Sequence, residues 1–143
     1  MEGRHRPGSF DGVMTVVLKL LNLVRAHRAY FGEKDYQQWR LIRDMVADFF
    51  IPTEIIACRT VRTATGLAES SRNALLSREG RAKAAAIYRT LTTAASAAEA
   101  FSILEAEGFA GDYVEEHWGR RFAAVRLEGI RLIDNVQWPN TAD

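Results

Sequence analysis

The sequence predicts an α/β protein in two parts: the tail of a parallel, doubly wound sheet layer, followed by a small α+β domain with a three-stranded antiparallel sheet. Residues 1–60 alternate as helix, strand, helix and strand, which is typical of a parallel layer. Residues 61–143 instead end in three strand-like runs. Because the loop over residues 63–77 is rich in Thr, Gly, Ser and Asn, we place the domain boundary near residue 60.

The first part opens with a strongly apolar helix, predicted over residues 10–27. Apolar side chains cover nearly its whole circumference, so we expect the helix to be buried on most sides. The run Ala29–Phe31 then predicts a short strand that ends at Gly32.

A second helix is predicted over residues 36–50, with Asp35 as its N-cap and Pro52 as its stop signal. The apolar run Glu54–Cys58 predicts a buried strand. Since parallel strands need cover on both faces, two short strands and two helices resemble the end of a larger domain.

The second part begins with a helix predicted over about residues 78–95 and capped by Ser77. A shorter helix is expected over residues 97–107, with Gly108 just beyond its end. The pair Glu128-Gly129 is a hairpin signal. The three predicted strands are Asp112–Glu116, Arg121–Leu127 and Ile130–Val136.

Composition and charge exclude several classes of protein. The chain is 48% apolar and 26% charged, with a net charge of +1, so neither disorder nor nucleic-acid binding is expected. Cys58, the only cysteine, lies in an apolar run and is expected to be a buried, inert thiol. The longest apolar segment, Val13–Val24, is interrupted by polar residues and falls short of the ~20 residues that span a membrane. Without a secretory signal at the start, a cytoplasmic protein is expected.

The segment Phe31–Gln38 is a candidate phosphate-binding turn. A strand ends, Gly32 allows a sharp turn, and a helix begins, which is where open α/β sheets bind ligands. Lys34 could neutralise a phosphate, Asp35 could accept hydrogen bonds from a ribose, and Gln38 could hold a hydroxylated substrate. The alternative is a solvated turn with an Asp cap.

The segment Gly66–Asn73 is the second candidate. Ser70 and Ser71 offer adjacent hydroxyl groups, and Arg72 adds a guanidinium that can grip a phosphate with two hydrogen bonds. The alternative is a polar interdomain loop capped by Ser and Asn.

Together the two segments resemble the pantothenate synthetase (pantoate–β-alanine ligase) family. The likeness runs almost continuously from Arg6 to Asn135. The stretches that carry it are Arg6–Val13, Phe31–Gln38, Leu67–Asn73 and Arg131–Asn135.

The resemblance implies a Rossmann-like nucleotide-binding domain, of which residues 1–60 are the C-terminal part. It also implies an ATP- and Mg²⁺-dependent reaction in which pantoate forms a pantoyl adenylate and the amine of β-alanine displaces AMP to give pantothenate. Members of the family are typically homodimers. Carried over by position, the nucleotide contacts are Gly32, Lys34 and Asp35, the pantoate contact is Gln38, and the phosphate contacts are Ser70, Ser71 and Arg72.

The sequence departs from the family pattern in several places. The His-x-Gly-His element that stabilises the adenylation transition state has no counterpart, and the family's second pantoate-holding glutamine and metal-binding acids lie in the same unmatched half. Ser9 stands where the family usually has histidine, and Glu69 replaces an apolar residue, usually Met or Leu. A carboxylate beside a triphosphate would cost about 1 kcal/mol or more. The link between the first two terminal strands, Glu116–Arg120, also looks shortened.

Three functions remain open. The first is a truncated or split ligase that needs a partner, or the missing N-terminal half, for catalysis. The second is a shortened paralogue without adenylation activity, repurposed in a specialised pathway or as a binding subunit. The third is a dimerisation module. No catalytic residue and no metal ligand is assigned within this chain.

Overall fold

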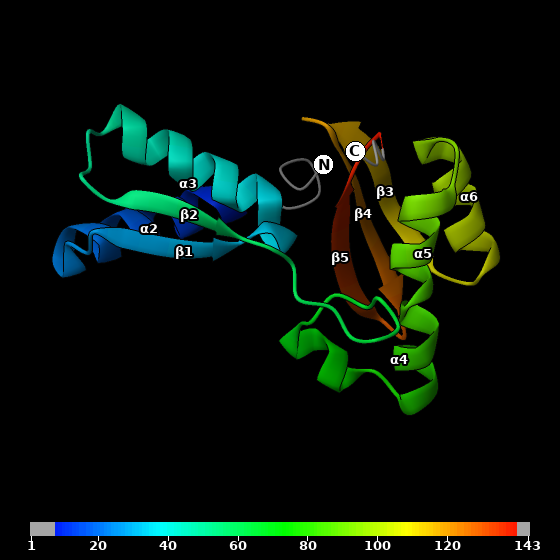
Figure 1. The fold of residues 1–143 in the computed structure, drawn as a ribbon. Coiled ribbons are helices and arrows are strands. Elements are labelled where there is room, and N and C mark those ends of the chain that lie inside the picture. Colours follow the sequence, from blue (N-terminus) through cyan, green and yellow to red (C-terminus); the bar gives the residue numbers. More distant parts are fainter. Residues whose placement is uncertain (1–7, 140–143) are drawn as a thin grey trace. The chain divides into compact units, whose positions relative to one another are not determined.

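The computed structural model describes residues 8–139 and divides the chain into two compact units, Met1–Arg59 and Thr60–Asp143 (Figure 1). Each unit has its own cluster of buried apolar side chains. The expected order of elements and the α/β fold class are confirmed. That the first unit is the tail of a nucleotide-binding domain stays a prediction.

Residues 8–59 of the first unit form a two-stranded parallel sheet with two α-helices. Strand β1 pairs with β2 so that Arg28 lies opposite Glu54 and Gly32 lies opposite Cys58. Both strand ends therefore meet at one edge of the sheet. The elements in order are α2 (Ser9–Val24), β1 (Arg28–Gly32), the 3-10 turn η1 (Glu33–Asp35), α3 (Tyr36–Asp48) and β2 (Glu54–Cys58).

Helix α2 is shorter and more exposed than its sequence predicts. It ends because Arg25 adopts a left-handed conformation (φ 51°) and donates its backbone N–H to the Leu21 carbonyl at 2.9 Å. The prediction that this helix is buried on most sides is wrong. Leu21 is only 7% exposed, but the outward-facing apolar side chains are between 52% and 69% exposed. These are Val16, Leu20, Leu23 and Val24. The physical reason is that, within residues 8–59, α2 contacts apolar side chains of α3 and the sheet on one side only.

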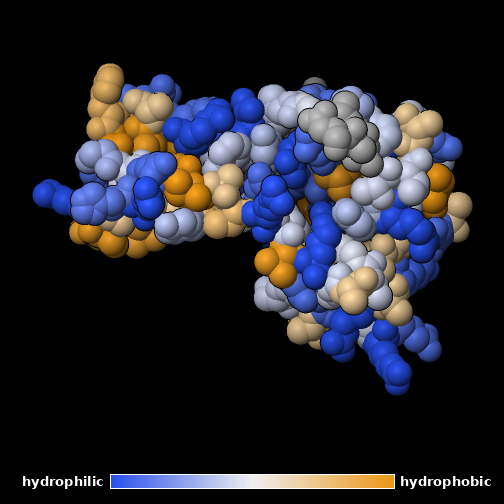
Figure 2. Space-filling view, in the orientation of Figure 1, coloured by the Kyte–Doolittle hydropathy of each residue, from blue (hydrophilic) through white to orange (hydrophobic). Residues whose placement is uncertain are grey.

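The parallel sheet is covered on one face among the described residues. Ala29, Phe31 and Ile55 pack against both helices, whereas Tyr30, on the opposite face of β1, is 64% exposed. Figure 2 shows apolar residues on the surface of this unit. The prediction that Cys58 is buried is wrong: it lies exposed at the last position of β2. Strand β2 as a whole is half-buried or exposed because the described part of the unit contains no second layer on its free side.

The second unit contains three helices and a three-stranded antiparallel sheet. The helix predicted over 78–95 is interrupted at Ala85 and forms α4 (Arg78–Ala84) and α5 (Ala86–Thr93). Ser77 caps α4 as predicted, accepting a hydrogen bond from the Gly80 N–H at 2.9 Å. The remaining elements are the 3-10 turn η2 (Ser71–Leu75), α6 (Ala97–Ala106), β3 (Ala110–His117), β4 (Arg120–Leu127) and β5 (Ile130–Gln137).

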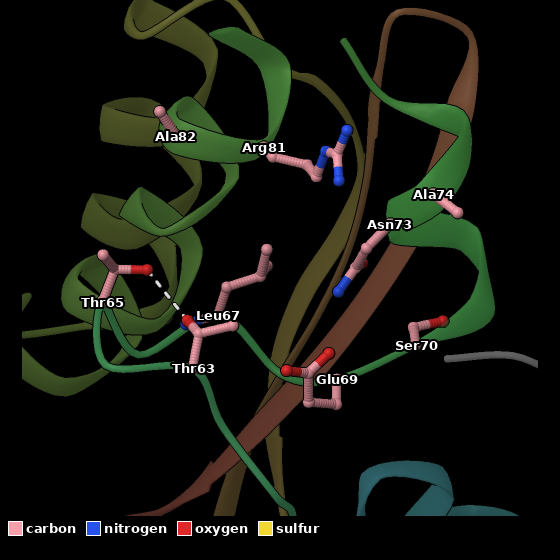
Figure 3. A pocket seen from close by; sticks show the side chains of 9 residues that line it. All are labelled: Thr63, Thr65, Leu67, Glu69, Ser70, Asn73, Ala74, Arg81 and Ala82. Atoms are coloured by element: carbon pink, nitrogen blue, oxygen red, sulfur yellow. Dashed lines mark hydrogen bonds between the residues drawn. The ribbon is translucent and has the colours of Figure 1, made fainter. Parts of the chain in front are cut away.

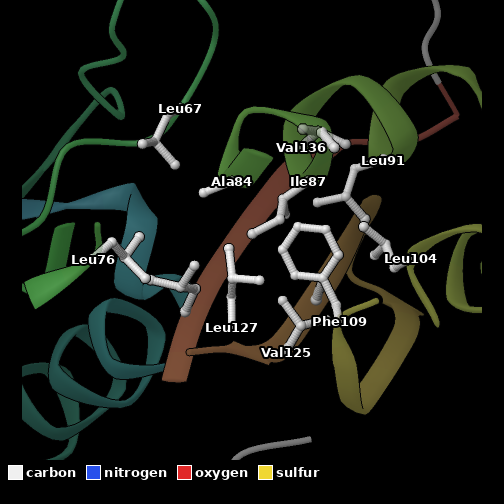
Figure 4. Close-up of a cluster of buried hydrophobic side chains, with 13 residues drawn as sticks. Leu67, Leu76, Ala84, Ile87, Leu91, Leu104, Phe109, Val125, Leu127 and Val136 are labelled. Carbon is white, nitrogen blue, oxygen red and sulfur yellow. The ribbon is translucent and has the colours of Figure 1, made fainter. Parts of the chain in front are cut away.

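The antiparallel sheet has the order β3-β4-β5, and all three predicted strands are confirmed, each slightly longer than expected. Trp118-Gly119 and Glu128-Gly129 form the two turns, and all four residues have positive φ, as two-residue hairpins of type I′ require. Helices α5 and α6 pack on this sheet (Figure 1). The core between them includes Ile87, Leu91, Leu104, Phe109, Val125, Leu127 and Val136 (Figure 4).

Candidate functional site

Four of the predicted site residues follow the end of β1 within the first unit. Gly32 is the last residue of the strand, Lys34 and Asp35 lie in η1, and Gln38 lies in the first turn of α3. Because Gly32 pairs with Cys58, this segment stands at the carboxyl edge of the parallel sheet. Ligands of open α/β sheets bind at such an edge.

The local geometry of Gly32 and Asp35 differs from the expected turn. Gly32 has extended dihedral angles (φ −71°, ψ 132°), so the backbone does not require glycine there. A Cβ atom at this position would meet nothing within 4 Å. Asp35 precedes α3 but makes no capping hydrogen bond, and it is exposed. The Asp cap, the alternative explanation of this turn, is therefore absent.

Lys34 and Gln38 are both half-buried. Next to Gln38, the indole ring of Trp39 lies 5.1 Å from the ring of Tyr36, and the Arg43 guanidinium lies 5.1 Å from the Trp39 ring. The buried Nε1 of Trp39 has no hydrogen-bond partner within residues 8–139. The start of α3 thus presents polar groups beside a packed aromatic pair.

The other three predicted site residues lie at the start of η2 in the second unit. The Ser70 hydroxyl accepts a hydrogen bond from the backbone N–H of Arg72 at 3.3 Å, which caps this turn. Ser71 and Arg72 are exposed. Asn73 is only 7% exposed and donates from Nδ2 to the Ala68 carbonyl at 3.0 Å. One side of the turn is therefore fixed by Asn73, while Ser71 and Arg72 face solvent.

A buried ion pair holds the loop that leads into η2. Arg62 donates to both carboxylate oxygens of Asp134 on β5, at 2.6 and 2.8 Å, and also to the Gly66 carbonyl at 3.0 Å. The Asp134 side chain is 4% exposed, and the Arg62 guanidinium stacks 4.1 Å from the Tyr88 ring. An isolated antiparallel bridge joins Arg62 to Ala68. These contacts tie both ends of the loop to the sheet and α5.

Glycine is required at one point of this loop. Gly66 has φ +91°, a conformation that side-chain-bearing residues rarely adopt. A Cβ atom there would also lie 2.5 Å from the Tyr88 ring. Glycine at this position therefore allows the backbone to pass close to the Tyr88 ring.

A pocket with a volume of about 480 Å³ lies beside η2 (Figure 3). Glu69 and Asn73 point into it, and Arg81 of α4 lies on its far side. Of the predicted phosphate contacts, only Ser70 lines the pocket. The lining residues are Thr63, Thr65, Leu67, Glu69, Ser70, Asn73, Ala74, Arg81 and Ala82.

The sequence alone did not identify Arg62, Asp134 or Arg81. Arg62 and Asp134 are 72 positions apart, and their pairing has no local signal. Asp134 lies within the Arg131–Asn135 stretch that carries the resemblance, which was the one available hint. Arg81 belongs to an ordinary exposed helix.

Residues 8–139 lack two kinds of feature, a membrane-spanning helix and a metal-binding cluster. No helix there is long and apolar enough to cross a membrane. In the same residues, no group of three or more His, Cys, Asp or Glu side chains could hold a metal ion.

Known proteins similar to this chain share one description. The pantoate–β-alanine ligase family model matches residues 1–137. Pantothenate synthetase from Bdellovibrio bacteriovorus is 54% identical over 137 residues, which cover 96% of this chain and 55% of that protein. The Legionella pneumophila enzyme is 53% identical over 135 residues, covering 94% of this chain and 54% of its own length.

Solved structures agree with the sequence relatives. Pantothenate synthetase from Thermus thermophilus superimposes with a TM-score of 0.85 at 42% identity, over 96% of this chain and 59% of that one. The Francisella tularensis ligase, solved with β-γ ATP and β-alanine, gives a TM-score of 0.89 at 41% identity, over 96% and 53%. The chain thus spans about half the length of its relatives. With a family model that matches 137 of its 143 residues, it belongs to the pantoate–β-alanine ligase family.

Proposed function

We propose that this chain carries the nucleotide- and pantoate-binding part of a pantoate–β-alanine ligase. The observation that carries the proposal is that every binding residue expected from the family within this half is present. These residues are Gly32, Lys34, Asp35, Gln38, Ser70, Ser71 and Arg72. The reaction is the ATP-dependent condensation of pantoate with β-alanine through a pantoyl adenylate.

The residues at the end of β1 are suited to a nucleotide and a small acid. The open space over Gly32 lets a ligand approach the backbone closely. Lys34 neutralises phosphate charge. The Asp35 side chain, which makes no capping hydrogen bond to α3, accepts hydrogen bonds from ribose hydroxyls. Gln38, one turn inside α3, offers an amide to the hydroxyl and carboxylate groups of pantoate.

The residues at the start of η2 are suited to the phosphates. The side chains of Ser71 and Arg72 are exposed and make no hydrogen bond or ion pair with described residues, so both are available to donate to a phosphate. The Arg62–Asp134 pair keeps the base of this turn in place.

In the first step, a pantoate carboxylate oxygen attacks the α-phosphorus of ATP and pyrophosphate leaves. In the second, the amine of β-alanine attacks the acyl carbon and AMP leaves. Both steps ask this chain to position the reactants and to neutralise charge on the phosphates. Mg²⁺ would further neutralise the triphosphate, but the residues described here do not form a site for it, so no step is assigned to it.

In this proposal, catalysis also needs the other half of a family ligase. The resemblance assigns the His-x-Gly-His element to that half, the part of the relatives to which this chain has no counterpart. The exposed apolar face of α2 supports this, since Leu20 and Leu23 are 52% and 69% exposed and a covering domain would bury them. A homodimer, as in the family, is part of the same proposal.

The binding claim is tested by calorimetry with ATP on the purified chain. We expect weak, millimolar-range binding, loss of binding in Lys34→Ala, and unchanged binding in the control Lys19→Ala, an exposed lysine of α2. Absence of any nucleotide binding at millimolar ATP would sink the nucleotide site. A pyrophosphate-release assay with pantoate and ATP should give no turnover for the chain alone.

A second candidate function is a paralogue that has lost adenylation. Glu69 favours it, because it puts a carboxylate next to the phosphate-binding turn where the family has an apolar side chain. Replacement of Glu69 by Met discriminates the two functions. If the ATP affinity of Glu69→Met rises to that of a family ligase, the Glu69 carboxylate is the group that weakens nucleotide binding.

A further inference from the structure

We propose that the β4–β5 hairpin positions the phosphate-binding turn through two of its own carboxylates, Asp134 and Glu128. Both are positioning residues, because each acts on the turn through another residue and has no assigned contact with a phosphate. The role rests on the proposed function, since the turn matters through its predicted phosphate contacts Ser71 and Arg72.

The first attachment to the hairpin comes before the turn. Asp134 of β5 accepts hydrogen bonds from both terminal nitrogens of Arg62, and the same guanidinium donates to the Asn135 carbonyl at 3.2 Å. The backbone N–H of Asn135 donates to Asp134 Oδ1 at 2.8 Å, which fixes the orientation of the carboxylate. One arginine therefore joins the start of the loop to two consecutive residues of β5.

The second attachment comes after the turn. Glu128, in the turn between β4 and β5, accepts hydrogen bonds from the Ser77 backbone N–H at 2.8 Å and from the Ser77 hydroxyl at 2.5 Å. A Cβ atom at Gly80 would lie 2.5 Å from the Glu128 carboxylate, so glycine leaves the space for this approach. The hydrogen bonds from Ser77 lower the pKa of the Glu128 carboxyl below its usual 4.5, so the charged carboxylate makes this contact at neutral pH.

The two attachments bracket the segment 62–77, which carries the predicted phosphate contacts. Inside it, the Asn73 backbone N–H donates to the Ser70 carbonyl, and the buried Asn73 side chain donates to the Ala68 carbonyl, both at 3.0 Å. The exposed side chains of Ser71 and Arg72 thus project from a turn that is fixed at both ends and braced within. A phosphate that binds a preformed turn loses less affinity to ordering of the loop.

The sign of the effect separates positioning from direct electrostatics. By charge alone, Asp134 and Glu128 oppose a phosphate, so removing either carboxylate would strengthen phosphate binding. Positioning predicts the opposite. A turn that keeps its binding conformation only about a tenth of the time binds its ligand about tenfold more weakly.

The test is a titration of the full ¹⁵N-labelled chain with inorganic triphosphate, followed by the amide shifts of residues 70–73. We expect binding to weaken about tenfold in Asp134→Ala and about threefold in Glu128→Ala. Glu128→Gln keeps an acceptor oxygen and should bind at least as well as the wild type. The matched control Glu105→Ala removes an exposed carboxylate of α6 and should change nothing.

Two further measurements on the same samples separate a displaced turn from an unfolded domain. Glu128 is exposed, so Glu128→Ala should keep the wild-type urea midpoint, and it decides the outcome if the buried Asp134→Ala variant does not fold. Without ligand, hydrogen exchange at the Glu69 and Asn73 amides, which are bonded to the Val61 and Ser70 carbonyls, should become faster in Glu128→Ala. The amides of β4 should stay protected.

A Glu128→Ala variant that binds triphosphate as well as the wild type, or better, would overturn the positioning role. Unchanged exchange at Glu69 and Asn73 in that variant would overturn it as well. A wild-type chain without saturable shifts at Ser71 and Arg72 would contradict the proposed function itself and, with it, the role assigned to the hairpin.

Discussion

The two units of this chain bury their apolar side chains to very different extents. The second unit encloses a cluster of thirteen buried apolar residues between its helices and sheet. In the described residues of the first unit, the corresponding cluster has four buried members, Leu21 of α2 and Ile42, Met45 and Val46 of α3. The comparison teaches that the second unit closes around its own core, whereas the described part of the first unit leaves large apolar side chains exposed.

The largest difference between the two units should appear when each is produced as a separate fragment and its folding is measured. A fragment of residues 60–143 should unfold cooperatively in urea and show dispersed amide resonances, because its core is internal. A fragment of residues 1–59 should do neither, since so few buried residues cannot offset its conformational entropy. Cooperative unfolding of the 1–59 fragment would break the comparison.

The next largest effect concerns charged side chains. Arg121 is fully buried and donates to the Leu91 and Ala94 carbonyls at the end of α5, at 3.0 and 2.6 Å. Arg121→Met leaves these carbonyls without a donor and should lower the free energy of unfolding by about 2–4 kcal/mol in urea titrations.

The matched control lies in the first unit. Arg28 pairs with Glu54 on the surface, with both side chains about 60% exposed, so Arg28→Met should leave the urea midpoint nearly unchanged. Equal effects of the two substitutions would mean that burial does not distinguish the units.

A smaller effect depends on pH. Burial alone would raise the pKa of the Asp112 carboxyl, but hydrogen bonds and the positive charges of Arg131 and Arg126 lower this pKa below its usual 3.8. Asp112 therefore stabilises the fold above about pH 4, and this contribution is lost as the pH falls through the folded-state pKa.

Asp112→Asn should cost about 1–2 kcal/mol at pH 7, because Arg131 loses a charged acceptor at 2.6 Å. It should also flatten the loss of stability below pH 4, as followed by thermal unfolding at several pH values. An unchanged acid profile would show that other carboxylates control it.

The smallest effect is expected on the outer face of α2. Leu23 is 69% exposed, so Leu23→Gln should change the free energy of unfolding by no more than about 0.5 kcal/mol. The control Leu104→Ala, in the core of the second unit at 1% exposure, should cost about 2–5 kcal/mol. A large loss for Leu23→Gln would indicate that α2 is already covered.

What could be predicted from the sequence follows the range of each interaction. The Glu128-Gly129 turn and the Ser77 cap depend on neighbouring residues, and both are confirmed. The burial of α2 and of Cys58 depends on what covers them, and both predictions are wrong for the described chain. Apolar residues in the sequence indicate that a segment tends to be buried, but they do not identify the part of a protein that covers it.

In the candidate site, too, features that depend on neighbouring residues could be predicted, and contacts between distant residues could not. Two segments, Phe31–Gln38 and Ser70–Asn73, were found from local pattern and family likeness, and the roles of their residues remain predictions. The Arg62–Asp134 pair joins residues 72 positions apart, and a single sequence carries no signal for such a contact.

The most direct test of the central claim is a hybrid protein. The N-terminal part of the Bdellovibrio bacteriovorus relative, up to the matched 137 residues, is joined to this chain, and pyrophosphate release is measured with ATP and pantoate. We predict release by the hybrid and its loss in the same hybrid with Lys34→Ala. A folded hybrid that releases no pyrophosphate, or a Lys34→Ala hybrid as active as its parent, would contradict the claim that this chain supplies a working half of the ligase site.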